Sequence, residues 1–104
     1  MAQFDVYQNP NRDTNDVIPF LLDVQAELLD RLATRVVVPL VVAEEMPLPA
    51  KQLNPLFKIK GIAVVMSTTE LAGVPNRALG DKVASLKNKR DEIIAALDML
   101  FTGI

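Results

Sequence analysis

The sequence predicts an α+β domain in which a small twisted antiparallel sheet, or a partly closed barrel, packs against one long C-terminal helix. Two observations support this fold. Short segments rich in β-branched residues follow one another closely through the first three quarters of the chain. The last quarter, residues 81–104, repeats apolar side chains at steps of three and four, the spacing of one helix face. With 104 residues, the chain is expected to form a single domain over residues 1–104.

The N-terminal part of the chain predicts two strands joined by a loop. Residues 3–7 alternate polar and apolar side chains and place Phe4 and Val6 on one face. Residues 9–16 are dense in Asn, Asp and Pro, which is typical of a loop. This loop is long for a hairpin connection. It is either a solvated loop or a loop that contacts a partner, and the first interpretation is favoured. Residues 17–25 predict the second strand.

The middle of the chain predicts a long strand and a hairpin. Residues 34–43 are strongly β-branched, which favours a strand. Pro39 cannot donate to a ladder, so we expect a bulge or a sheet edge at this position. Residues 54–60 and 62–68 lie on either side of Gly61, a pattern that indicates a β-hairpin.

Two segments between these elements have weaker signals. Residues 26–33 fit either a continuing strand or a turn of helix. Residues 69–75 have few strand features and predict a short helical turn ended by Gly73 and Pro75.

Residues 81–104 predict the only long helix. Either Asp81 or Ser85 is expected to cap its start with a side-chain oxygen. Its far end is apolar on one side and small or weakly polar on the other, so this second side is either ordinary surface or a face for dimerisation or binding. The residues expected to line the apolar stripe are Val83, Leu86, Arg90, Ile93, Leu97 and Leu100.

Composition argues against most catalytic functions. The chain has no cysteine and no histidine, which excludes disulfides and thiolate metal sites and removes the commonest acid–base catalyst. The hydroxyl residues at positions 67–69 therefore have no histidine to activate them. Asp23, Glu27 and Asp30 do not suit one strand face, so we expect solvated turn residues there. We expect that the protein is not an enzyme and that it binds neither a metal nor a cofactor.

The charge balance and the chain ends restrict the partners further. Eleven basic residues face 13 acidic ones, for a net charge of −2, which argues against gripping a phosphate backbone. The basic cluster of Lys87, Lys89 and Arg90 adjoins two acidic residues and is expected to be a solvated helix face. The N-terminus lacks a signal pattern and no apolar run is long enough for a membrane span, so we expect a soluble cytoplasmic protein.

An ordered set of short blocks over the whole chain resembles the CcdB family, the toxins of CcdA–CcdB addiction modules. No single block is specific for this family, but the ordered set of blocks that ends in Phe-x-Gly-Ile is specific for it. The blocks are Gln3-Phe4-Asp5-Val6-Tyr7, Asp23-Val24-Gln25, Val38-Pro39-Leu40, Thr68-Thr69-Glu70-Leu71-Ala72-Gly73-Val74-Pro75 and Leu100-Phe101-Thr102-Gly103-Ile104.

This resemblance implies a homodimer whose subunits combine an SH3-like barrel with a long C-terminal helix. It implies no catalysis. Such toxins bind the A subunit of DNA gyrase and trap the covalent gyrase–DNA complex, and the antitoxin CcdA removes them. The resemblance also implies no direct binding of nucleic acid and no membrane partner.

The resemblance also implies the positions of the gyrase-binding residues. These positions are Leu28, Leu29, Asp98, Phe101, Thr102, Gly103 and Ile104. The best-known family member has tryptophan at the position of Thr102 and asparagine at that of Asp98. The alternative is a MazF-like endoribonuclease on the same fold, with Thr34 and Arg35 as possible active-site members. A degenerate toxin without activity is a third hypothesis.

Overall fold

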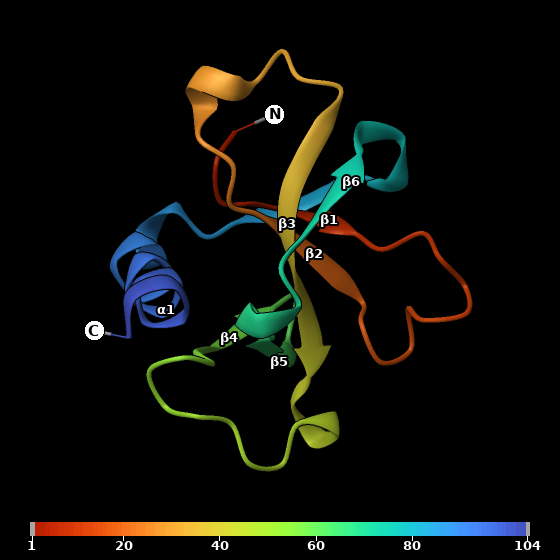
Figure 1. Ribbon diagram of the computed structural model, residues 1–104. Coiled ribbons are helices and arrows are strands. Elements are labelled where there is room, and N and C mark those ends of the chain that lie inside the picture. The colour runs from red at the N-terminus through yellow and green to blue at the C-terminus, as the bar shows by residue number, and fades with distance from the viewer. Residues whose placement is uncertain (1, 104) are drawn as a thin grey trace.

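The computed structural model describes residues 2–103, which form one curled antiparallel sheet and a C-terminal helix (Figure 1). Within these residues, six of the seven strands run in the order β4-β5-β3-β2-β1-β7, and β6 pairs with β3 outside this path. The sheet curls into a half-barrel, which confirms the predicted α+β, SH3-like architecture. The strands are β1 (Asp5–Gln8), β2 (Phe20–Asp23), β3 (Thr34–Val42), β4 (Leu56–Ile59), β5 (Ile62–Met66), β6 (Ala72–Pro75) and β7 (Lys82–Ser85).

Short 3₁₀ turns and one α-helix connect and complete the sheet. The turn η1 settles the ambiguous segment 26–33 in favour of a helical turn. The polar loop of residues 9–16 is confirmed. Within it the Asn9 side chain donates to the Thr14 hydroxyl, and it also donates to the Ile18 carbonyl just beyond the loop. The helical elements are η1 (Glu27–Leu29), η2 (Ala43–Glu45), η3 (Thr68–Glu70), η4 (Asn76–Ala78), η5 (Lys87–Lys89) and α1 (Arg90–Thr102).

The long strand β3 is confirmed, but it is an inner strand of the sheet. It pairs with β2 along one side, while β6 and β5 share its other side at residues 34–37 and 40–42. Pro39 lies between these two ladders, where no N–H is needed for either. Its register against Leu21 shows no shift, so the prediction of an edge or a bulge is wrong. A change of pairing partner accommodates the proline instead.

The predicted hairpin is confirmed as β4 and β5. A two-residue loop joins them, and its residues Lys60 and Gly61 have φ angles of 51° and 81°. Positive φ at both positions identifies a type I′ turn, whose twist matches that of the flanking strands. Glycine adopts this conformation without steric cost, which explains Gly61.

The predicted helical turn over residues 69–75 is wrong in its second half. Only η3 is helical, and Ala72–Pro75 form β6, which pairs with residues 34–37 of β3. β5 covers only residues 40–42 on its side of β3, so the backbone groups of residues 34–37 on that side need another partner. Tertiary pairing therefore overrides the weak local strand signal of this segment.

The predicted helix start is also wrong. Residues 82–85 form β7, which pairs with β1, and the α-helix begins only at Arg90. The apolar spacing of Val83 and Leu86 fits a helix face, but the free edge of β1 takes this segment as a strand instead. Ser85 accepts a hydrogen bond from the Lys87 N–H at 3.3 Å, so it supports η5 and not the long helix. The cap position of α1 is Lys89, which has no side-chain capping bond.

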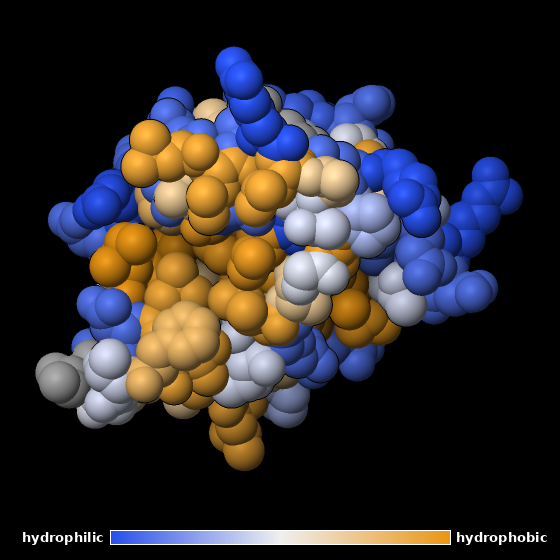
Figure 2. All heavy atoms as spheres, turned by 45° about the horizontal axis from the view of Figure 1, so that its top comes forward, coloured by the Kyte–Doolittle hydropathy of each residue, from blue (hydrophilic) through white to orange (hydrophobic). Residues whose placement is uncertain are grey.

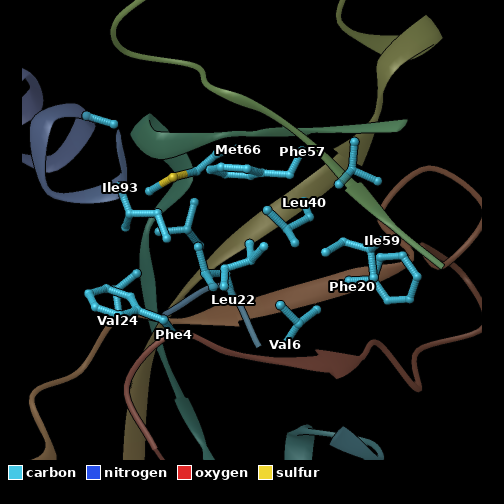
Figure 3. Close-up of a cluster of buried hydrophobic side chains, with 14 residues drawn as sticks. Phe4, Val6, Phe20, Leu22, Val24, Leu40, Phe57, Ile59, Met66 and Ile93 are labelled. Carbon is cyan, nitrogen blue, oxygen red and sulfur yellow. The ribbon is translucent and has the colours of Figure 1, made fainter. Parts of the chain in front are cut away.

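The core lies between the concave side of the sheet and α1 (Figure 3). Phe4 and Val6 both enter it, as their alternation predicts. Figure 3 shows Ile93 pointing from α1 toward Met66. Ile93 and Ala96 are the buried residues of α1, while Leu97 and Leu100 are half-buried. The predicted stripe therefore holds the helix to the sheet mainly through Ile93.

We expect Ile93→Ala to lower the free energy of unfolding by about 2–5 kcal/mol, because it leaves a cavity in a fully buried site. Leu48→Ala is the control, since Leu48 is 93% exposed, and we expect a change below about 0.5 kcal/mol. Urea denaturation followed by circular dichroism measures both. Similar losses in the two variants would contradict this account of the core.

Candidate functional site

The C-terminal end of α1 presents side chains to solvent. Asp98, Phe101, Thr102 and Gly103 are all exposed, and Phe101 is 69% exposed. An aromatic ring left largely in water on a regular helix contributes little to the fold. The last predicted site residue, Ile104, lies outside the described residues.

Two hydrogen bonds fix the geometry of this helix end. Gly103 has a φ of 75°, and its N–H donates to the Met99 carbonyl at 3.1 Å. This left-handed cap ends the helix in a way that glycine allows without strain. The Thr102 hydroxyl donates to the Asp98 carbonyl at 2.7 Å, one turn earlier. The hydroxyl proton is therefore already used within the helix.

A second exposed apolar group lies on η1 and just after it. Leu28 is 97% exposed, and Leu29 and Leu32 are about half exposed, at 48% and 49%. Buried Gln25 holds this turn: its side chain donates to the Leu29 carbonyl at 2.9 Å and accepts from the Val36 N–H at 3.0 Å. The leucines are thus presented on a turn tied to β3.

The structure brings the four described residues at the end of α1 together, but it does not bring η1 against them. Figure 1 shows η1 at the top of the view and the end of α1 at the left. No backbone hydrogen bond joins the two groups among residues 2–103. Figure 2, in which the top of the view of Figure 1 is turned forward, shows a broad apolar area on that face of the molecule. Exposed apolar areas of this kind mark binding surfaces on proteins.

A buried charged cluster, which the sequence did not predict, lies beneath η1. Arg35 and Asp23 are both fully buried, and the Arg35 Nε and Nη2 donate to Asp23 Oδ2. The Arg35 Nη1 also contacts Asp30 Oδ1 at 3.2 Å. The prediction that Asp23 is a solvated turn residue is therefore wrong, whereas Glu27 is exposed as predicted. The available signal was a charge inside each of two strongly apolar strands.

Burial and the neighbouring hydrogen-bond donors shift the pKa of Asp23 in opposite directions. Removal from water raises the pKa of its carboxyl, whereas the Gln25 N–H and the Arg35 guanidinium lower it. Burial is the largest of these effects, so the pKa lies above its ordinary value. The pair stays together because each charge is the other's buried partner.

A neighbouring pair, Asp5 and Tyr7, extends the polar cluster along β1. The Tyr7 hydroxyl contacts Asp5 Oδ2 at 3.4 Å, and the Lys82 ammonium lies 3.3 Å from Asp5 Oδ1. Burial, together with the negative charge of Asp5, raises the pKa of Tyr7 to about 12. The phenol thus remains protonated over the physiological range.

This arrangement argues against the ribonuclease hypothesis. Arg35 is fully enclosed and paired with two carboxylates, so its guanidinium cannot reach a substrate phosphate. The Ser67 hydroxyl donates to Glu70 and the Thr68 hydroxyl to the Leu53 carbonyl, which are structural contacts. In the described part of the chain, no three acidic side chains are grouped as a metal site, and no helix has the length and apolarity needed to cross a membrane.

We expect Asp23→Asn to cost about 3–5 kcal/mol of folding free energy, because it leaves the Arg35 charge buried without its main partner. Asp30→Asn is the matched control on the same guanidinium. The Asp30 side chain is 50% exposed, so we expect a loss of no more than about 1 kcal/mol. Chemical denaturation at neutral pH compares the two, and equal losses would show that the buried pair is not the stabilising contact.

The raised pKa of Tyr7 predicts a loss of stability at high pH. Between pH 10 and pH 12 the unfolded chain releases this proton while the folded protein keeps it, so stability falls as the pH rises. The loss over this window is about 2 kcal/mol. Tyr7→Phe cannot titrate and should lack this loss. Urea denaturation of both proteins from pH 9 to pH 12 measures the difference. If the free energy of unfolding falls equally with pH in both proteins, the pH dependence does not come from Tyr7.

The comparison with known families agrees with this fold. Residues 3–103 match the family model described as CcdB protein, which is nearly the whole chain. The match includes the half-barrel, η1 and the described end of α1. Its members are toxins of toxin–antitoxin modules, as the ordered blocks in the sequence also indicate. The chain belongs to the CcdB family.

Proposed function

We propose that this protein is a homodimeric toxin that binds the A subunit of DNA gyrase, traps the cleaved gyrase–DNA complex and is neutralised by the antitoxin CcdA. The exposed end of α1, in a chain of this family, carries the proposal. The toxin acts by binding and not by catalysis. Its contact surface consists of Asp98, Phe101 and the terminal residues 102–104, with Leu28 and Leu29 as a second element.

Phe101 supplies the largest apolar contribution to this surface. It is 69% exposed in the free chain, so a partner can bury most of its ring. Full burial of such a side chain is worth about 1.5–3 kcal/mol. An exposed leucine pair on η1 adds apolar area of the same kind, and a few well-buried residues carry most of the binding energy of an interface.

Asp98 supports a binding role because it is unfavourable for the helix itself. It lies one turn before the last residue of α1, and no basic side chain is present in the last turn. The carbonyl end of a helix carries partial negative charge, and a carboxylate there typically costs about 0.3–1 kcal/mol. A negative charge retained at a cost to the helix fits a positively charged surface on the partner.

Thr102 changes what the helix end offers. The Thr102 hydroxyl is bound to the Asp98 carbonyl, so it contributes a methyl group and an acceptor oxygen to a partner. It has no flat ring to stack on a guanidinium. Phe101 and Asp98 therefore carry more of the proposed contact in this chain.

Deleting residues 102–104 tests the proposal. We expect the truncated protein to keep its circular dichroism spectrum and most of its thermal stability, because the buried residues of α1 are Ile93 and Ala96. It should lose both binding to the gyrase A subunit in a pull-down and inhibition of growth. Leu48→Ala, which removes an exposed leucine elsewhere, should retain both.

Three results would distinguish the alternatives. A truncated chain that remains fully toxic would overturn the proposed surface. Sequence-specific cleavage of cellular RNA by the purified protein would favour the ribonuclease. A full-length chain that neither binds gyrase nor inhibits growth, but gains binding with Thr102→Trp, would identify a degenerate toxin.

A further inference from the structure

The segment of residues 26–34, which carries η1, has no buried side chain of its own. Every residue in this range is exposed, whereas the flanking residues Gln25 and Arg35 are buried. Figure 1 shows the segment as the connection from β2 to β3. Burial of apolar side chains usually fixes a turn against the core, but that contribution is small here. Polar contacts from outside the segment must therefore fix its conformation.

Two of these contacts act on the residues after η1. The Asn76 side chain donates to the Leu32 carbonyl at 3.2 Å, and the Asn76 N–H donates to the Ala33 carbonyl at 3.0 Å. The Arg35 guanidinium reaches the Asp30 carboxylate, whose side chain is 50% exposed. Both contacts fix the return of the chain to β3. Neither binds the backbone of η1 itself.

Gln25 is the buried side chain that binds the backbone of η1. Its Nε2 donates to the Leu29 carbonyl at 2.9 Å, and its Oε1 accepts from the Val36 N–H of β3 at 3.0 Å. Its own N–H donates to Asp23 Oδ1 at 2.9 Å, which holds the Gln25 backbone in place. A neutral amide donates from one atom and accepts at the other, so one side chain connects η1 to β3. An apolar side chain of the same length makes neither bond.

We propose that Gln25 is a positioning residue, which sets the conformation of η1 in which Leu28 and Leu29 meet the gyrase A subunit. This inference rests on the proposed function. Gln25 is 6% exposed, so it acts through η1 and not by touching the partner. A turn that is fixed before binding loses less conformational freedom on binding, which raises the affinity.

Gln25→Met tests the positioning in the free protein, because methionine keeps the length of the side chain and removes both hydrogen bonds. NMR relaxation measures backbone order parameters for residues 27–32. We expect values of about 0.85 in the unsubstituted protein and below about 0.6 in the variant, with the values in β2 and β3 unchanged. A thermal melt verifies that the variant is folded. If it is not, Gln25→Asn, whose shorter amide cannot make both bonds, takes its place. An η1 that stays equally rigid would overturn the proposal.

Binding to the immobilised gyrase A subunit tests whether Gln25 acts through the leucines. We expect Gln25→Met to weaken binding about tenfold, the order of one or two hydrogen bonds. In a chain that already carries Leu28→Ala and Leu29→Ala, the same change should weaken binding less than about twofold, because the side chains that it positions are gone. In a chain with Phe101→Ala the loss should again be about tenfold. Equal losses in the two chains would show a general effect on the fold and would overturn the proposal.

Gln3→Ala is the matched control. The Gln3 side chain donates to the Val24 carbonyl at 3.1 Å, next to Gln25 in the chain, and this bond does not involve η1. We expect unchanged order parameters in η1 and a change in binding below about twofold. An unsubstituted protein that does not bind the gyrase A subunit would overturn the proposed function and this inference together. Binding that does not depend on Gln25 would overturn this inference alone.

Discussion

The buried pair of Arg35 and Asp23 holds together β2, β3 and the turn η1. Arg35 lies on β3, which pairs with three other strands, so its side chain has no route to solvent. Its guanidinium must therefore find carboxylates inside the protein, and it finds Asp23 at the end of β2 and Asp30 just after η1. One side chain thus fixes the β2–β3 ladder and the turn that displays the exposed leucines. A cation that could have served catalysis is used to hold the fold together.

The same central position of β3 explains why the sheet remains open. Two partners share one side of this strand, and the sheet curls from it until β4 and β7 border a common cavity. A fully closed barrel would satisfy these edges by pairing them. Here the edges carry lysines, which discourage pairing with further copies of the chain. The opening between β4 and β7 and the buried cluster are therefore two consequences of how the strands are arranged around β3.

The sequence predicted the features that local pattern determines. The alternation around Phe4 and Val6, the β-branched run of β3 and the hairpin at Gly61 all appear as expected. The errors occur where a distant partner decides. Residues 82–85 have helical spacing but complete β1, and Ala72–Pro75 form a strand because β3 offers a free side. The candidate residues at the end of α1 came from the family resemblance, since spacing alone left that face open.

The helix α1 serves two opposed requirements, and the division falls along its length. Its first half supplies Ile93 and Ala96 to the core, where loss of either would leave a void. Its C-terminal end carries Asp98 and Phe101, neither of which helps the helix to fold. A fold selected for stability alone would place a basic residue there and a polar one instead of the exposed ring. The unfavourable C-terminal end is tolerated because the core contacts lie upstream of it, and this separation leaves the end of the helix available for a partner.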